Sequence, residues 1–155
     1  MKNRSKSIGL ALIAVFCMWA ALPSGSTGLT GIQWHPYNEG MALGKSKNKK
    51  VLINFYADWC GYCKLMDQKT FADPTVISYL NEHFISIKVN ADKERMVAAI
   101  YRVNPLPDTW FISEKGKPIG NKLGFVSAKD LLPILKFIST DSYLKMSYKE
   151  FLKSF

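Results

Sequence analysis

Four apolar segments of the chain have the length and residue types of β-strands. Residues 51–56 (Val-Leu-Ile-Asn-Phe-Tyr) form a continuous β-branched and aromatic run, which is typical of a strand covered on both faces in a parallel or mixed sheet. Residues 84–89 (Phe-Ile-Ser-Ile-Lys-Val) alternate between apolar and polar types, which is the period of a strand. Residues 109–113 and 118–123 flank a turn that contains Gly116, and we expect them to form a hairpin.

Apolar residues at the spacing of a helix occupy most of the chain between these strands. Asp73 and Ser127 are good N-caps, and Pro74 suits a first helical position. We expect helices over about 37–47 and 60–70, from Asp73 past Leu80, over 94–101 with Met96, Val97 and Ile100 facing inward, and from Ser127 to about Ser139. The resulting order predicts one α/β domain in which a central sheet is covered by helices.

The first 26 residues have the layout of a secretory signal peptide. Lys2, Arg4 and Lys6 precede an apolar run over residues 8–22, and small residues follow it. The run is shorter than the roughly 20 apolar residues that a membrane-spanning helix needs. We therefore expect cleavage near Ala20 or Ala21 and treat Cys17 within the run as incidental, with an uncleaved membrane anchor as the alternative.

Composition limits what the remaining residues can form. The chain has 155 residues, 48% of them hydrophobic and 13% aromatic, which suits one folded domain and argues against disorder. We place that domain at residues 29–140, followed by a C-terminal helical extension at 141–155 that packs on it.

The net charge of +9 falls to an excess of six basic residues without the leader. Its one dense run, at Lys45, Lys47, Lys49 and Lys50, is interpreted as a solvated helix end and turn, so we expect no nucleic-acid partner.

Cys60 and Cys63 are the two cysteines that remain after the leader. A disulfide between residues three apart closes too small a loop to add much stability, since the entropic gain grows with loop length. A zinc site needs about four ligands, and His35 and His83 have no ligand spacing with the cysteines. We therefore expect no metal site, and a Cys-x-x-Cys motif between a strand and a helix favours redox chemistry.

A helix that begins at Cys60 gives the two sulfurs different roles. Free backbone N–H groups and the positive end of the helix dipole favour the Cys60 thiolate, which makes Cys60 the nucleophile. Cys63 lies one helical turn further on and can attack the mixed disulfide formed at Cys60. We expect Cys60 and Cys63 to be the catalytic residues, with no cofactor beyond this redox-active pair.

The residues around the motif resemble the thioredoxin superfamily. The resemblance covers about residues 32–138 and rests on the segment 55–64 (Phe-Tyr-Ala-Asp-Trp-Cys-Gly-Tyr-Cys-Lys), on Pro107 before a strand and on Gly124 after the hairpin. Residues 70–76 and 90–92 are most similar to the C-terminal domain of bacterial transmembrane thiol:disulfide interchange reductases and to related exported proteins. The resemblance implies a thioredoxin-like fold, a central mixed β-sheet flanked by helices, with an added N-terminal helix and the C-terminal helical tail.

The resemblance also implies a substrate-binding surface. Pro107 aligns with the family's cis-proline, which faces the disulfide, with Pro105 as the competing candidate. The expected substrate-binding residues are Trp59, Gly61, Tyr62, Leu106 and Pro107. Asp108 stands where the family commonly has Thr, a departure that puts the substrate preference in doubt.

Asn54 is a second departure, because the family often places a buried carboxylate six residues before the first cysteine. An amide cannot take the proton of the resolving cysteine. Asp67, four residues after Cys63 on the same helix face, and Asp58 are the candidates for a proton relay. For Asp67, a plain surface position on the helix is the alternative.

These features predict a thiol–disulfide oxidoreductase of the bacterial periplasm, tethered to the membrane if the leader is retained. We expect a monomeric reductase that acts on exported protein disulfides or thiols and draws electrons from a membrane partner. Isomerase and oxidase follow in order, since Gly61-Tyr62 occurs in the family's isomerases but the chain shows no separate dimerisation domain. A soft-metal-binding module and a redox-inactive structural protein are the alternatives of another class.

Overall fold

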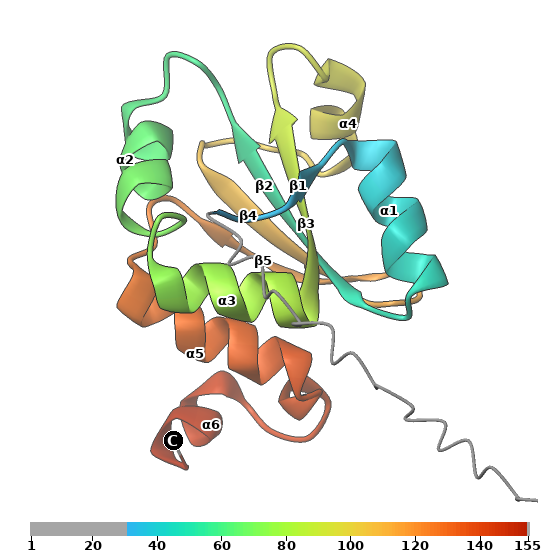
Figure 1. Cartoon of the computed structure of the whole chain (residues 1–155), viewed down its shortest axis with the longest axis vertical. Helices are drawn as coiled ribbons and strands as arrows, with labels where there is room; N and C mark the ends of the chain where they lie inside the picture. The colour runs from blue at the N-terminus through green and yellow to red at the C-terminus, as the bar shows by residue number, and fades with distance from the viewer. Residues whose placement is uncertain (1–30, 155) are drawn as a thin grey trace, which may run out of the picture.

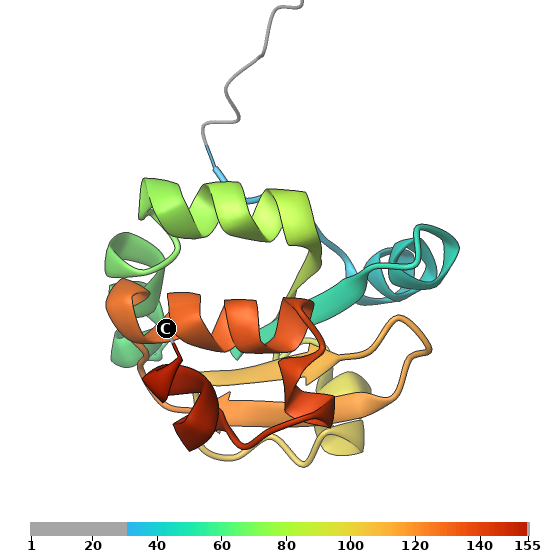
Figure 2. The same ribbon diagram turned by 90° about the horizontal axis from the view of Figure 1, so that it is seen from below.

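A computed structural model describes residues 31–154 as one sheet covered by helices on both faces (Figures 1 and 2). The predicted signal peptide lies outside the described residues. Among the helices of the described part, none is long and apolar enough to cross a membrane.

The sheet has five strands in the order β1-β3-β2-β4-β5. Strands β1 and β2 run parallel to β3, whereas β4 is antiparallel to β2 and β5 is antiparallel to β4. The strands are β1 (Trp34–His35), β2 (Lys50–Tyr56), β3 (Phe84–Asn90), β4 (Asp108–Ile112) and β5 (Pro118–Leu123). The expected mixed sheet is confirmed, and within residues 31–154 the one strand that the pattern did not predict is the two-residue β1.

Helices cover both faces of this sheet. Helices α3 and α5 lie side by side on one face, and α1 and α4 lie on the other (Figures 1 and 2). The helical elements are α1 (Tyr37–Ser46), α2 (Gly61–Lys69), α3 (Pro74–His83), α4 (Arg95–Ile100), α5 (Ala128–Ser139), the 3-10 turn η1 (Ser142–Leu144) and α6 (Tyr148–Lys153). The predicted caps are present, since Asp73 accepts hydrogen bonds from the N–H groups of Thr75 and Val76, and Ser127 accepts one from Asp130.

Each face of the sheet has its own apolar core. On the α3/α5 face, Leu52 and Phe111 of the sheet pack against buried residues of α2, α3 and α5 such as Met66, Leu80 and Leu131. On the α1/α4 face, the buried cluster consists of Val51, Ile53, Phe55, Ile85, Ile87, Val89, Tyr101 and Ile112. Strand β2 contributes to both clusters, which explains why residues 51–55 carry almost no polar side chains.

Helix α4 corrects the predicted set of inward-facing residues. Met96 is 85% exposed and Ile100 is 69% exposed, and of the three residues expected to face inward only Val97 packs against the core. The helix has six residues, fewer than two turns, so one contact position is enough to hold it. The prediction for Met96 and Ile100 was therefore wrong.

Lys50 corrects the interpretation of the lysine run as a solvated turn. Its side chain is buried at the start of β2, where the ammonium lies 2.8 Å from the Asp141 carboxylate and 3.6 Å from Glu114. Burial acts to lower the pKa of Lys50, but the hydrogen bond and charge of Asp141, together with Glu114, raise it above its ordinary value. This cluster joins β2, the β4–β5 hairpin and the start of the C-terminal extension.

Gly40 of α1 lies at a close approach between this helix and the sheet. A Cβ atom at this position would lie 2.3 Å from Cγ1 of Ile87, which is fully buried in β3. We therefore expect Gly40→Ala to destabilise the fold by about 1–3 kcal/mol through overpacking, as measured by urea unfolding. The matched control is Gly120→Ala in β5, where a Cβ would meet no atom within 4 Å. Equal stability of Gly40→Ala and the parent would contradict this account of α1 packing.

Candidate active site

The pairing of β2 with β4 brings two distant segments to one edge of the sheet. Phe55 near the end of β2 lies opposite Asp108 at the start of β4. Because the two strands are antiparallel, the residues that follow β2 and those that precede β4 emerge at the same edge. Cys60 follows β2 and Leu106 precedes β4, and both belong to one buried cluster that also contains Ala57 and Cys63. The sequence-predicted site is thus assembled from two loops.

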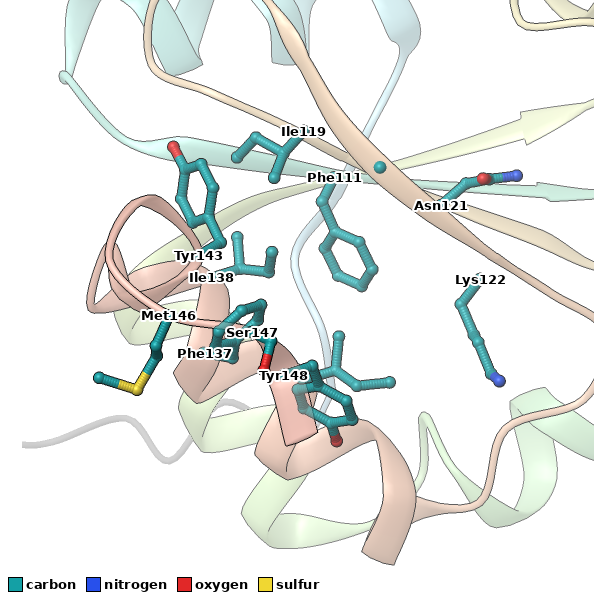
Figure 3. A pocket seen from close by; sticks show the side chains of 12 residues that line it. Phe111, Ile119, Asn121, Lys122, Phe137, Ile138, Tyr143, Met146, Ser147 and Tyr148 are labelled. Carbon is teal, nitrogen blue, oxygen red and sulfur yellow. The ribbon is translucent and has the colours of Figure 1, made fainter. Parts of the chain in front are cut away.

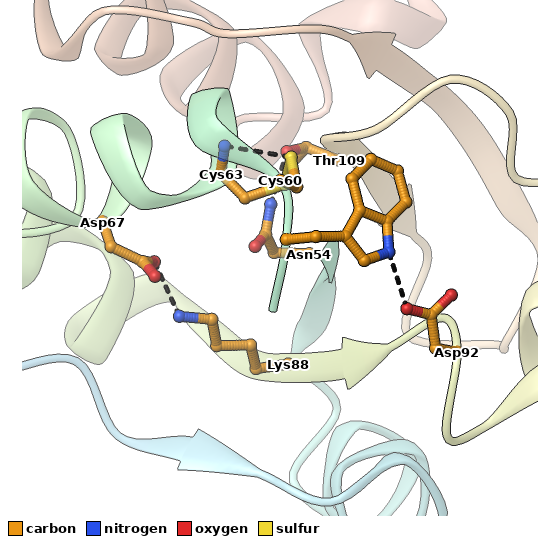
Figure 4. Close-up of a disulfide and its surroundings, with 8 residues drawn as sticks. Asn54, Cys60, Cys63, Asp67, Lys88, Asp92 and Thr109 are labelled. Carbon is orange, nitrogen blue, oxygen red and sulfur yellow. Dashed lines mark hydrogen bonds and ion pairs between the residues drawn. A yellow bond between two sulfur atoms is a disulfide. The ribbon is translucent and has the colours of Figure 1, made fainter. Parts of the chain in front are cut away.

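The two cysteines form a disulfide at the start of α2 (Figure 4). Cys60 is the N-cap of this helix, with extended backbone, and its Sγ accepts a hydrogen bond of 3.1 Å from the N–H of Cys63. Cys60 is 5% exposed and Cys63 is 4% exposed. The helix N-terminus therefore directs a free backbone donor at the Cys60 sulfur, the arrangement that stabilises a thiolate once the disulfide is reduced.

The loop before β4 contains two cis peptide bonds, Asn104–Pro105 and Leu106–Pro107. The resemblance had placed a cis-proline at Pro107 and treated Pro105 as its competitor, whereas both prolines are cis. Pro107 is buried, and its carbonyl accepts a hydrogen bond of 2.8 Å from the N–H of Gly124. Gly124 has a φ of +78°, which glycine adopts without strain, so this residue type allows the close backbone contact.

Exposed aromatic side chains flank the disulfide. Trp59 is 72% exposed, and its indole Nε1–H donates a hydrogen bond of 2.8 Å to Asp92 (Figure 4). Tyr62 is 67% exposed. A hollow of about 370 Å³ separates Trp59 from the proline loop and is lined by Trp59, Ala91, Asp92, Ala98, Val103, Asn104, Pro105 and Leu106. The indole is thus held in one orientation beside an open, partly apolar surface.

Asn54 is buried in β2 on the same face of the sheet as α2. Its Nδ2 donates a hydrogen bond of 3.2 Å to Oγ1 of Thr109 in β4, and it is 2% exposed (Figure 4). This hydrogen bond joins two uncharged groups, an amide and a hydroxyl. The buried position that the resemblance associates with a carboxylate is therefore neutral in this protein.

The two carboxylates predicted as proton relays are both paired with lysines. Asp67 Oδ1 lies 2.6 Å from Lys88 Nζ, and Lys88 is the register partner of Asn54 in the neighbouring strand. Asp58 lies 3.0 Å from the Lys93 ammonium and is 66% exposed, compared with 39% for Asp67. Of the two carboxylates, Asp67 is thus the one that pairs with a residue adjacent to Asn54 in the sheet, namely Lys88.

Asp108 is a buried carboxylate that sequence reasoning noted only as a departure from the family pattern. It follows Pro107 directly and is 1% exposed. One oxygen accepts a hydrogen bond of 2.8 Å from the Trp110 indole N–H, and the other accepts one of 2.9 Å from the Asn121 amide. Burial raises the pKa of Asp108, although both hydrogen bonds act in the opposite direction. An acidic residue after Pro107 was the available sequence signal, but its burial depends on pairing between β4 and β5.

Residues 31–154 contain no group of three or more His, Cys, Asp or Glu side chains placed to hold a metal ion. His35 pairs with Glu39 in α1, and His83 lies beside Glu82 and the Tyr79 ring. Neither histidine belongs to the buried cluster around the disulfide. The Cys60–Cys63 disulfide at the start of α2 can exchange with an external thiol.

Comparisons with known proteins agree with this geometry. The model of a thioredoxin-like domain family matches residues 37–139. The thioredoxin of Mycoplasmoides gallisepticum is 30% identical over 91 residues, which is 59% of this chain and 86% of that protein. The thiol:disulfide interchange protein DsbD of Vibrio vulnificus is 32% identical over 104 residues, 64% of this chain but 18% of DsbD. This chain therefore spans less than a fifth of that longer protein.

A solved structure extends the comparison to the fold of the site. The oxidised C-terminal domain of DsbD from Neisseria meningitidis is 25% identical, with a TM-score of 0.55, and the match covers 68% of this chain and 99% of that domain. The correspondence with DsbD is therefore with its C-terminal domain.

The buried Asp108 predicts a pH-dependent stability difference. Since its folded-state pKa is raised above the ordinary value of 3.8, the folded protein binds the proton more tightly than the unfolded chain. Stability from this group is complete below that value and is lost as pH rises through the folded-state pKa. In Asp108→Asn, the amide oxygen accepts from Trp110 and the amide nitrogen donates to a rotated Asn121. We expect the free energy of unfolding of Asp108→Asn, relative to that of the parent, to be higher at pH 7 than at pH 3. Urea unfolding of both proteins at both pH values measures this difference. A pH-independent difference would show that Asp108 ionises normally.

Proposed function

The chain belongs to the thioredoxin-like domain family, whose members named thioredoxin and DsbD are thiol–disulfide oxidoreductases, and we propose that it acts in the bacterial periplasm as a reductase of exported proteins. One observation carries the mechanism, namely that Cys60 Sγ caps α2 within 3.1 Å of the Cys63 N–H. Charge on that sulfur is stabilised by the helix terminus, which makes Cys60 the attacking group.

In the proposed cycle, the reduced Cys60 thiolate attacks one sulfur of a substrate disulfide. A bond forms between Cys60 and that sulfur while the other substrate sulfur leaves as a thiolate. The Cys63 thiol then loses its proton and attacks the Cys60 sulfur, forming the Cys60–Cys63 disulfide and releasing the second substrate thiolate. Two electrons have moved from the cysteine pair to the substrate, and the disulfide seen in the structure is the product state of the protein.

The surface around the sulfurs supports binding of an extended polypeptide. Leu106 contacts the cysteine cluster and is half-buried, so the loop lies close enough for its backbone to pair with a substrate. Trp59 and Tyr62 contribute exposed aromatic surface, and a Cβ at Gly61 would meet no atom beyond its chain neighbours within 4 Å, so Gly61 leaves the surface beside Cys60 open. We propose that Trp59, Gly61, Tyr62, Leu106 and Pro107 together bind the segment that carries the substrate disulfide.

We assign the proton of Cys63 to Asp67 in preference to Asp58. Asp67 is one helical turn beyond Cys63, and the Lys88 ammonium at 2.6 Å holds it on the side of α2 that faces β3. Asn54 cannot accept the proton itself, because its amide nitrogen is a donor and is bonded to Thr109. A water molecule between Cys63 and Asp67 would complete the path.

The reducing direction and the location rest on different observations. Similarity to DsbD, a thiol:disulfide interchange protein, supports electron transfer between thiol–disulfide pairs. We propose that the acceptors are exported proteins and that the donor lies in the membrane. A reduction potential near −270 mV would mark a reductant, and one near −120 mV an oxidant.

The basic start and apolar run of residues 1–26 support export, with membrane tethering as the state of an uncleaved chain. We propose a monomer that acts through its own cysteine pair, because isomerisation, which would favour a dimer, ranks below reduction for this chain.

The first test is to remove the resolving sulfur. In Cys63→Ala, Cys60 can attack a substrate but the mixed disulfide cannot resolve, so covalent complexes should accumulate. We expect these complexes on non-reducing gels of periplasmic extracts, and mass spectrometry of them would identify substrates and electron donor. The matched control is the double variant Cys60→Ala/Cys63→Ala, which should form none. Complexes of equal yield through Cys63 in Cys60→Ala would reverse the proposed roles of the two sulfurs.

The second test separates the two candidate proton acceptors. We expect Asp67→Asn to slow the release of substrate from the mixed disulfide by about 100-fold or more at neutral pH, because general-base assistance is lost. The defect should shrink as pH rises and hydroxide removes the Cys63 proton. Stopped-flow measurement of the resolving step from pH 6 to 10 checks this profile. The same profile in Asp58→Asn, with Asp67→Asn unaffected, would assign the role to Asp58.

A further inference from the structure

The C-terminal extension forms one wall of an apolar hollow away from the disulfide (Figure 3). Its volume of about 480 Å³ is within the range of about 300–1,000 Å³ found for small-molecule sites. The hollow is lined by residues of β4, β5, α5, η1 and α6 and the segments between them, namely Phe111, Ile119, Gly120, Asn121, Lys122, Ile134, Phe137, Ile138, Tyr143, Met146, Ser147 and Tyr148. None of the residues proposed above for disulfide exchange is among them.

Gly120 creates the space on the sheet side of the hollow. It pairs with Phe111 in register, and a Cβ atom at this position would meet no other atom within 4 Å. Its φ lies outside the left-handed region, so the backbone itself does not require glycine. The absence of a side chain at Gly120 therefore leaves open space on the sheet side of the hollow.

The opposite wall is held in place by contacts within the extension. The Phe137 ring of α5 packs edge-on against Tyr143 and Tyr148, with ring centroids 6.5 and 5.3 Å apart. Ser147 and Glu150 form a reciprocal capping box at the start of α6. With Asp141 bound to Lys50, the extension is fixed at both ends of the wall, so the hollow is a built feature of the fold.

The two ends of the hollow differ in chemistry. Ile119 and Tyr143 lie at one end, whereas Lys122 and the hydroxyl of Tyr148 lie toward the other (Figure 3). Within residues 31–154, no hydrogen bond or ion pair holds the Lys122 ammonium. The Tyr148 hydroxyl is a donor at neutral pH, and burial, followed by the charge of Asp130, raises its pKa further. One end thus offers a cation and a hydrogen-bond donor, and the rest is apolar.

We propose that this hollow binds a single-chain amphiphile with a carboxylate head, an anion of the fatty-acid type. The alkyl chain lies between β5 and α5 over Gly120, and the carboxylate pairs with the Lys122 ammonium and accepts from the Tyr148 hydroxyl. A neutral chain would leave the ammonium without a counter-charge, and a cationic head would be repelled by it. The Lys122 charge therefore favours an anion, although the Asp130 carboxylate that acts on Tyr148 opposes it at the hydroxyl.

Titration of the full, oxidised chain with decanoate below its micelle concentration tests the proposal, with calorimetry as the readout. Gly120→Val fills the space over β5 with a residue that strands favour, and we expect it to weaken decanoate binding at least tenfold. Lys122→Gln should weaken binding about fivefold and remove the preference for decanoate over 1-decanol. The matched control is Lys117→Gln, an exposed lysine outside the hollow, which should bind like the parent.

These variants also separate the hollow from other apolar surface. Any decanoate bound by the apolar residues 8–22 is common to the parent and all variants, so it cancels in the comparison. Thermal unfolding of Gly120→Val without ligand checks that the fold is retained.

Undetectable binding to the parent, or equal affinity of the parent and both variants, would overturn the site. Equal affinity for decanoate and 1-decanol in the parent would overturn the choice of an anion. Disulfide exchange rates should be the same in all four proteins, so failure here leaves the oxidoreductase proposal unaffected.

Discussion

The antiparallel register between β2 and β4 is the constraint on which the site depends. With Phe55 opposite Asp108, the loop that leads to Cys60 and the loop that contains Pro107 must leave the sheet at the same edge. A shift of the register by one residue would turn the buried side chains of β4 to the opposite face. It would also displace Leu106 from the cluster with Cys60 and Cys63. Both faces of β2 and β4 are packed, so the two apolar cores that stabilise the domain also hold the redox site in place.

The distribution of charge around this edge differs from the pattern expected of the family. The buried position beneath α2 carries the neutral Asn54–Thr109 pair, so no buried charge opposes ionisation of the sulfurs from that side. Carboxylates occur instead at Asp67, neutralised by Lys88, and at Asp108, whose partners are the neutral groups of Trp110 and Asn121. A buried carboxylate without a cation is costly when ionised, and Asp108 lies next to Pro107. The proline loop is therefore bordered by the one group of the site whose charge is poorly compensated.

Most of the fold could be predicted from sequence because its main elements are long and strongly patterned. The four longer strands and the caps at Asp73 and Ser127 follow from local residue types. The two-residue β1 has too few positions to show a period, and α4 is too short for its apolar residues to indicate which ones are buried. Lys50 was misjudged because its partners, Glu114 and Asp141, are distant in sequence and meet it only in the folded chain.

The same distinction applies to the site. The cysteine pair and its position at a helix start could be predicted, since motif and helix are adjacent in sequence. The role of Pro107 came from family resemblance, with spacing to the following strand as the reason to prefer it over Pro105, and both peptide bonds are in fact cis. The hollow over Gly120 could not be predicted, since it requires β5 and the extension to meet across α5. The family match ends at residue 139, just before this extension begins. The extension is anchored to Lys50 in the central strand and lies opposite Gly120 across the hollow, so both walls of the hollow are positioned by contacts that are distant in sequence.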